Sequence, residues 1–187
     1  MVTNTLVEAD FLTFERNSDT KHELIFNELI EMSGASFKHT KIVRNLLVIF
    51  SNLFETHSVE FQAISNDLRV TNPLNDSYCY PDIVVIEGEP QFIDTEFDTL
   101  LNPVMIVEVL SNSTEKRDQI EKFEIYKSIP SIKEYIIVAQ QKPFIKHYKK
   151  LALNHWEFFE YNQLNESISA LDNKFTIKIE DIYDKCF

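Results

Sequence analysis

Two acidic residues lie where the sequence predicts buried strands, and they are the residues best suited to chemistry. Asp82 follows Pro81 at the start of one apolar stretch, and Glu108 lies inside another, Val104–Leu110. An ionised carboxylate inside a buried strand is costly unless a lysine or a metal ion neutralises it. Two carboxylates on neighbouring strands would offer the oxygen ligands that Mg²⁺ prefers. Together with Lys122, from the helix expected to follow, they would suit metal-assisted hydrolysis of a phosphodiester.

Each of these residues also has a plainer explanation. Lys122 could be a solvated helical lysine paired with Asp118, which lies one helical turn earlier. Asp82 could be a turn residue at the start of its strand. The three residues together favour a functional role for Lys122, because Glu108 has apolar neighbours and needs a cation or a proton. The turn role of Asp82 stays open.

The composition predicts one domain in a reducing compartment. A chain of 187 residues with 44% hydrophobic residues can bury a full core, so we expect a single domain over residues 1–187. Cys79 and Cys186 form no cysteine framework and no signal peptide is visible, which favours the cytoplasm. No apolar run approaches the roughly 18 residues that a membrane span needs. With only Gly34 and Gly88, the chain has no glycine-rich phosphate-binding loop.

The charge distribution bears on the substrate. A net charge of −12 argues against loose, nonspecific adhesion to nucleic acid. Residues 114–150, however, hold nine Lys and Arg against five Asp and Glu, a net of +4. This basic segment suits a polyanionic substrate, but it could equally be a solvated face of a helix and a strand.

Hydrophobic periodicity predicts an α/β fold. Apolar residues recur with a helical period from His39 to Glu55, which is the clearest helix of the chain. A hairpin is expected around Asn27-Glu28, and a strand pair at about 59–71 and 79–86. The other expected elements are helices at 7–16 and 114–128 and strands at 104–110, 133–139, 143–149, 154–161 and 174–179. Strands mixed with two main helices indicate one domain around a central sheet.

Two local patterns add detail to this scheme. The segment Ser111–Thr114 offers several residues that could cap the following helix. An aromatic group near the C-terminal end is expected to form a two-sided core strand rather than a platform for stacking bases. Its members are Trp156, Phe158, Phe159 and Tyr161.

Short motifs along the chain form an ordered series. They are Met32-Ser33-Gly34-Ala35 with His39, Tyr80-Pro81-Asp82-Ile83-Val84-Val85, Val107-Glu108-Val109-Leu110-Ser111, Asp118 with Lys122 and Tyr126, Glu134-Tyr135, and Ile182-Tyr183. The series resembles the Uma-two family, whose members are described as restriction endonucleases of the PD-(D/E)XK nuclease superfamily. Each motif is weakly specific alone, whereas their order covers nearly the whole chain.

The resemblance implies a restriction-endonuclease-like fold, with a central mixed β-sheet flanked by helices, and a DNA endonuclease that uses Mg²⁺ or Mn²⁺. In the superfamily, the acids that match Asp82 and Glu108 hold the metal, and a lysine positions the attacking water. That lysine normally follows the second acid by two residues, where this chain has Leu110. In the Uma-two family, which this chain resembles, the lysine lies instead on the next helix, and Lys122 occupies that position. Superfamily nucleases often pair to cut two strands, so we expect a homodimer by analogy.

Glu23 and His39 also match positions of the family and are additional candidates for the site. Both have plainer roles, since Glu23 could flank a hairpin in water and His39 could cap the long helix. Asn27 stands where the family usually has a glycine, and asparagine tolerates the left-handed turn conformation.

Two hypotheses for the function follow. In the first, the chain is a Mg²⁺-dependent endonuclease in which Asp82 and Glu108 hold the metal and Lys122 orients the water. In the second, it is a catalytically silent module that binds nucleic acid or protein on the same fold, as the acidic composition favours. Retention of all three residues favours the first hypothesis, because a silent scaffold gains nothing obvious from a buried Glu108.

Overall fold

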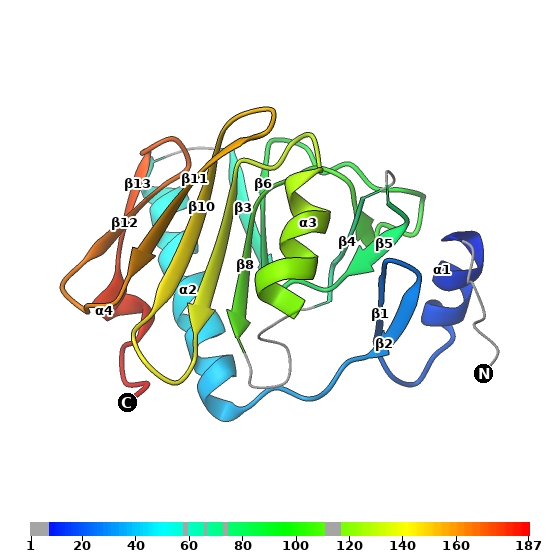
Figure 1. The fold of residues 1–187 in the computed structure, drawn as a ribbon, viewed down its shortest axis with the longest axis horizontal. Helices are drawn as coiled ribbons and strands as arrows, with labels where there is room; N and C mark the ends of the chain where they lie inside the picture. The colour runs from blue at the N-terminus through cyan, green and yellow to red at the C-terminus, as the bar shows by residue number, and fades with distance from the viewer. Residues whose placement is uncertain (1–7, 58–59, 66, 73–74, 111–116) are drawn as a thin grey trace.

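The centre of the molecule is a six-stranded mixed sheet with the strand order β11-β10-β9-β8-β6-β3 (Figure 1). The computed structural model describes residues 8–57, 60–65, 67–72, 75–110 and 117–187. The strands of this sheet are β3 (Phe61–Ser65), β6 (Ile83–Glu87), β8 (Pro103–Leu110), β9 (Glu134–Ala139), β10 (Ile145–Ala152) and β11 (His155–Tyr161). The strand β8 runs parallel to β9 and antiparallel to β6, so the strand predicted at 104–110 is indeed central.

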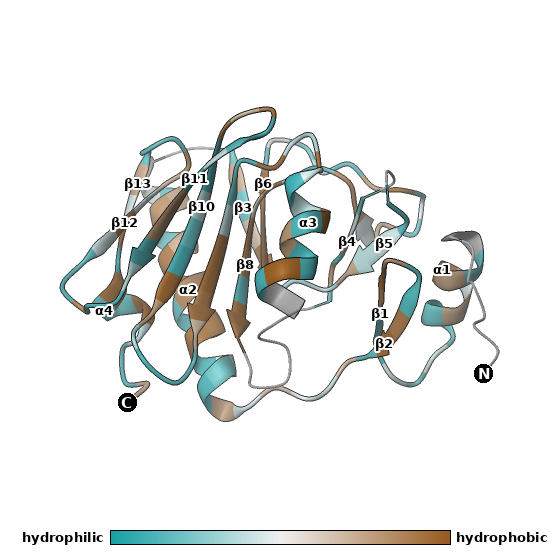
Figure 2. Ribbon diagram, viewed as in Figure 1, coloured by the Kyte–Doolittle hydropathy of each residue, from teal (hydrophilic) through white to brown (hydrophobic). Residues whose placement is uncertain are grey.

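Different helices cover the two faces of this sheet. One face carries α2 (Phe37–His57), α4 (Ile179–Ile182) and the hairpin of β12 (Ser167–Ala170) and β13 (Phe175–Lys178), and the other carries α3 (Lys122–Lys127). Figure 2 shows hydrophobic residues along β8, which is buried over its whole length. Because successive side chains of a strand alternate between faces, Val107 and Val109 join the α2 core, whereas Ile106 and Leu110 join the α3 core. Glu108 therefore lies on the α3 side.

The predicted helices agree with the structure. The long helix predicted from His39 to Glu55 is α2, and the N-terminal helix is α1 (Glu8–Arg16). The third helix is described as a π-helical turn, η1 (Arg117–Glu121), that continues into α3 and ends before Pro130 as expected. Its predicted cap at Ser111–Thr114 lies outside the described residues. No helix in the described ranges is long and apolar enough to cross a membrane.

A second, smaller sheet has the order β2-β1-β5-β4-β7. Its strands are β1 (His22–Ile25), β2 (Glu28–Glu31), β4 (Arg69–Asn72), β5 (Ser77–Cys79) and β7 (Thr99–Leu100). The predicted hairpin is confirmed, but its turn is Phe26-Asn27, one residue earlier than expected, with a φ of 48° at Phe26 and 66° at Asn27. Two successive positive φ angles suit the right-handed twist of the flanking strands, and asparagine adopts them at low cost. Phe11 of α1 packs on this sheet, 4.9 Å from the ring of Tyr78.

The two segments predicted to pair, 59–71 and 79–86, do pair with each other, but neither forms one continuous strand. Each predicted strand is two strands in different sheets, since β3 pairs with β6 in the large sheet and β4 pairs with β5 in the small one. Between β5 and β6 lies Pro81, which lacks the N–H group that a continuous ladder would require. This interruption places Asp82 immediately before β6, where the two sheets meet.

The aromatic strand near the C-terminal end is also not the core strand that its composition predicted. The strand β11 is the last strand of the large sheet, and five of its seven residues are exposed. Phe158 and Phe159 retain 49% and 37% exposure. Strands β9, β10 and β13 lie close to their predicted ranges, whereas β12 and the two-residue β7 were not predicted.

Candidate active site

The antiparallel pairing of β6 and β8 brings the two predicted metal ligands together. Ile83 lies opposite Val107, and the same register places Asp82 opposite Glu108. Both carboxylates line one cleft, with a volume of about 850 Å³, between the large sheet, the small sheet and the start of α2. The three other candidates, Glu23, His39 and Lys122, line this same cleft.

Asp82 is held by two elements. Its Oδ2 accepts a hydrogen bond of 2.7 Å from the backbone N–H of Val109, and its Oδ1 lies 2.8 Å from Nε2 of His39. The cap of α2 is Ser36, whose hydroxyl accepts a bond of 3.1 Å from the backbone N–H of His39. The alternative role of His39 as a helix cap is therefore wrong, and its ring is turned toward Asp82.

Lys122 connects the two other carboxylates. Its Nζ lies 2.8 Å from Oε1 of Glu23 and 3.0 Å from Oε1 of Glu108. Lys122 is only 4% exposed, Glu23 4% and Glu108 3%. Both plainer explanations are therefore wrong: Lys122 is not a solvated lysine, and Glu23 does not flank its hairpin in water. The side chain of Asp118, the partner considered for Lys122, is not described.

Neutral donors complete the environment of these acids. The Tyr126 hydroxyl, one turn after Lys122 on α3, donates to Oε1 of Glu108 over 3.0 Å. The backbone N–H of Tyr80 donates to Oε1 of Glu23 over 2.9 Å. Burial, with further contributions from nearby groups that include Glu108, raises the pKa of Tyr126 well above its usual value, so the phenol remains a donor.

The charges in the cleft do not cancel. Asp82, Glu108 and Glu23 contribute three carboxylates, against which Lys122 provides one positive charge and His39 at most one more. A buried excess of negative charge favours binding of a cation or a proton. The arrangement can therefore accept positive charge beside the Asp82 and Glu108 carboxylates.

Gln140 is a cleft residue that the sequence did not single out. It directly follows β9, is 6% exposed, and its Oε1 accepts a hydrogen bond of 2.6 Å from the Ser36 hydroxyl. Sequence reasoning could have found Gln140 only from its place directly after a predicted strand. Because β8 and β9 are parallel, they end at the same edge of the sheet, and this edge carries Glu108.

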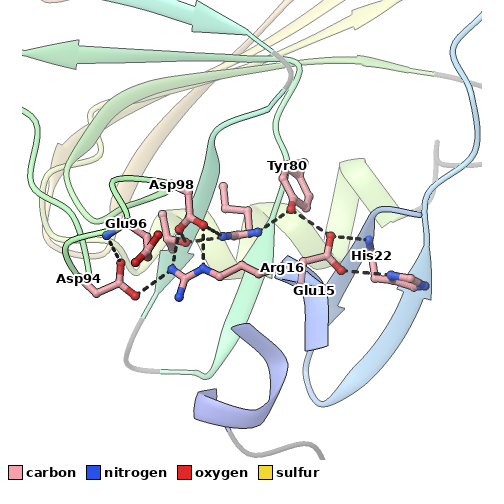
Figure 3. A network of polar contacts seen from close by, with 9 residues as sticks. Glu15, Arg16, His22, Tyr80, Asp94, Glu96 and Asp98 are labelled. Atoms are coloured by element: carbon pink, nitrogen blue, oxygen red, sulfur yellow. Dashed lines mark hydrogen bonds and ion pairs between the residues drawn. The ribbon is translucent and has the colours of Figure 1, made fainter. Parts of the chain in front are cut away.

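A polar network behind the cleft fixes the element that carries Glu23 (Figure 3). Glu15 of α1 accepts hydrogen bonds from the His22 backbone N–H, at 2.9 Å, and from the Tyr80 hydroxyl, at 3.0 Å. Burial raises the pKa of Tyr80 to about 12, so its hydroxyl stays protonated and also accepts a bond from Arg69. Since Tyr80 also binds Glu23 through its backbone, the network links α1 to the cleft.

The same network continues to the segment between β6 and β7. Arg16 binds Asp98 through Nε and Nη2 and binds Asp94 through Nη2, all at 2.8 Å, and Arg69 forms a second ion pair with Asp98 (Figure 3). The Arg16 guanidinium holds the pKa of Asp98 well below its usual range. These contacts anchor α1 onto the small sheet.

Comparison with known proteins places the chain in a family. The family model Uma2, described as "Putative restriction endonuclease", matches residues 8–179. The chain belongs to the Uma2 family. It is 32% identical over 166 residues to the uncharacterized protein sll1609 of Synechocystis sp. (strain ATCC 27184 / PCC 6803 / Kazusa), covering 89% of this chain and 93% of that protein. The uncharacterized protein slr1290 of the same organism is 27% identical over 178 residues, covering 95% and 91%.

A solved structure shares the fold of this Uma2 chain. It is the crystal structure of a protein titled "putative nuclease belonging to DUF820" from Anabaena variabilis ATCC 29413, with a TM-score of 0.72 and 14% identity. The match covers 96% of this chain and 98% of that one. The expected fold, mixed sheets flanked by helices, is thereby confirmed.

The donor set of the Uma2 cleft suits a hard divalent cation. Among the described residues, no three His, Cys, Asp or Glu side chains form a ready cluster of metal ligands. Two adjacent carboxylates nevertheless match the way Mg²⁺ is often bound, through one or two protein carboxylates with waters and substrate phosphates as the other ligands. Asp82 and Glu108 are the pair whose strand positions allow this.

Proposed function

We propose that this Uma2 protein is an endonuclease that hydrolyses DNA phosphodiester bonds with Mg²⁺ or Mn²⁺. The observation that carries the proposal is Lys122, which is buried beside Glu108 in the cleft that Asp82 also lines. A lysine and two strand-borne acids are suited to stabilising the charge that develops on a phosphate under attack. Membership of a family described as "Putative restriction endonuclease" supports the same reaction class.

Each residue of the cleft has a role in this proposal. Asp82 and Glu108 would hold the cation, which when bound would polarise the phosphate and lower the pKa of a bound water. Lys122, oriented by Glu23, would position the attacking water and stabilise the phosphate oxygens. His39 and Tyr126 would act as positioning residues, because they hold Asp82 and Glu108 respectively.

The proposal includes the setting of the reaction. Cleavage of both strands of a duplex needs two sites, which a homodimer would supply. The two cysteines are free and buried, in agreement with a reducing compartment such as the cytoplasm.

A catalytically silent binding module is the second candidate. The observation in its favour is that Lys122 is already paired with two carboxylates, as in a purely structural ion-pair cluster. The acidic side chain of Glu31 on the wall of the cleft, and a net charge of −12, also disfavour close approach of a polyanion.

Nicking of supercoiled plasmid in Mg²⁺ or Mn²⁺ separates the two candidates. We expect cleavage by the wild type, and a loss of at least about 100-fold in Asp82→Asn, the scale of removing one electrostatic group. Glu31→Gln is the matched control, since it removes an exposed carboxylate from the same cleft and should cleave normally. If the wild type and Asp82→Asn both bind oligonucleotides and neither cleaves DNA, the silent module is favoured.

A further inference from the structure

The outer edge of the large sheet is open at β11. This strand is hydrogen-bonded to β10 on one side, and within the described residues it has no strand partner on the other. It is seven residues long, contains no proline, and five of its residues are exposed. An uncovered edge of this kind presents a row of backbone N–H and C=O groups on which another strand can pair.

A ladder of aromatic rings runs across the sheet and ends at this edge. From the site outward, the ring centroids of Tyr126 and Tyr135 are 5.4 Å apart, those of Tyr135 and Tyr148 are 6.1 Å, and those of Tyr148 and Phe158 are 4.9 Å. Exposure rises along the ladder, from 0% at Tyr135 to 49% at Phe158. The last ring is half solvated, so a further aromatic ring placed beyond it would bury apolar surface and continue the ladder.

The sequence of β11 restricts how two copies of it could pair. In an antiparallel pair, two opposite residues either both point their backbone N–H and C=O groups at the partner strand or both point them away, and the two cases alternate along each strand. When a strand pairs with its own copy, the twofold axis must therefore pass beside a residue and not between two residues. Centring on Glu157 or on Glu160 would place two like charges directly opposite each other, which destabilises the pair. Centring on Phe158 opposes no two glutamates and is the arrangement that pairs all seven residues, His155 to Tyr161.

We propose that this protein forms a twofold-symmetric dimer in which β11 pairs antiparallel with β11 of a second copy, centred on Phe158. Phe158 then lies opposite Phe158 of the second copy, and Trp156 lies opposite Glu160. The two aromatic ladders meet on one face, and the two large sheets become one continuous sheet. None of the residues that line the catalytic cleft belongs to β11, so both clefts stay open. The interface does not depend on the proposed nuclease activity.

Sedimentation equilibrium over a range of concentrations tests the surface. We expect a dimer for the wild type and a dissociation constant raised at least about tenfold in Phe158→Glu, because two carboxylates would oppose each other in place of two rings. Phe37→Glu, the same change at a residue of α2 that is 84% exposed, should leave the dissociation constant unchanged. Phe158 also packs on Tyr148 within its own chain, so a modest fall in the melting temperature of the variant is expected and does not bear on the dissociation constant of the folded protein. A wild type that stays monomeric, or equal dissociation constants in both variants, would overturn the proposal.

Disulfide trapping tests the register independently. In the proposed pairing, Cα atoms of the two copies of residue 158 lie about 4.5–5.5 Å apart, within reach of a disulfide. Residue 159 of one copy instead lies opposite residue 157 of the other. The Cα atoms of the two copies of residue 159 are then about 8 Å apart, too far for a disulfide. Phe158→Cys should therefore give a covalent dimer on mild oxidation, whereas Phe159→Cys and the wild type, whose two cysteines are buried, should not. Trapping at 159 in place of 158 would overturn the proposed register.

Discussion

Lys122 is buried between two carboxylates that come from different sheets. Glu23 lies on β1 of the small sheet and Glu108 on β8 of the large one, so the lysine fastens α3 to both. If Lys122 only oriented water, as the sequence suggested, its truncation would be expected to leave the fold stable. The geometry changes that expectation, because removing one member of a buried ion cluster leaves the others without compensation.

Lys122→Ala should therefore destabilise the protein as well as abolish cleavage. We expect the free energy of unfolding to fall by about 3–5 kcal/mol, the usual effect of breaking a buried ion pair. Lys127→Ala, which removes a more exposed lysine from the same helix, should change it by less than about 0.5 kcal/mol. Urea denaturation of the two variants and the wild type measures both values. A loss as small as that of Lys127→Ala would show that the Lys122 cluster is solvated.

Glu108→Gln should have little effect on stability when no metal is added. The amide oxygen can still accept from Tyr126, and Lys122 keeps Glu23, while one unit of buried negative charge is removed. We expect a change within about 1 kcal/mol in buffer with a chelator. A loss above about 2 kcal/mol would instead assign Glu108 a structural role that requires its charge.

At the scale of elements, Asp98 makes most of the ionic contacts between α1 and the segment before β7, and Asp94 makes a further one. The pKa of Asp98 is lowered in the folded state, chiefly by its hydrogen bonds to Arg16. A lowered pKa means that the ionised carboxylate stabilises the fold above about pH 4, the unfolded pKa of Asp, and that this stability is lost as the pH falls further.

Asp98→Asn should lower the free energy of unfolding at pH 7 by about 1 kcal/mol, a value reduced for partial exposure of the carboxylate. The difference from the wild type should shrink as the pH falls below about 4, because the Asp98 carboxyl of the unfolded wild-type chain then takes up a proton that the folded chain does not. Denaturation curves at pH 7 and at pH 3 measure the two differences. A difference that does not change with pH would mean that Asp98 acts through packing and not through its charge.

At the scale of the whole molecule, a cation at the cleft would connect β6 to β8 and stabilise the folded chain. A ligand that binds only the native state raises stability by about 2.7 kcal/mol at one hundred times its dissociation constant. Mg²⁺ or Mn²⁺ should therefore raise the melting temperature, and Asp82→Ala should abolish the shift. Glu31→Gln provides the control, since it should retain the shift. Equal shifts in the wild type and Asp82→Ala would remove Asp82 from the metal site.

Local patterns in the sequence were sufficient for much of this description. The helical period from His39 to Glu55, the hairpin at Asn27 and the apolar strand around Glu108 depend on contacts between residues close in the chain. The candidate site residues Asp82, Glu108 and Lys122 were predicted as a group because a carboxylate among apolar neighbours requires a positive partner. The resemblance to the Uma-two family added Glu23 and His39.

Other properties depend on which segments become neighbours in space. The two strands predicted at 59–71 and 79–86 pair with each other as expected, but each divides between two sheets, because long-range contacts decide which sheet each half joins. The aromatic residues of β11 have the composition of a core strand, but they lie on an edge, since strand order decides burial. Only the tertiary structure could place Glu23 against Lys122, because the small sheet must first pack beside α3.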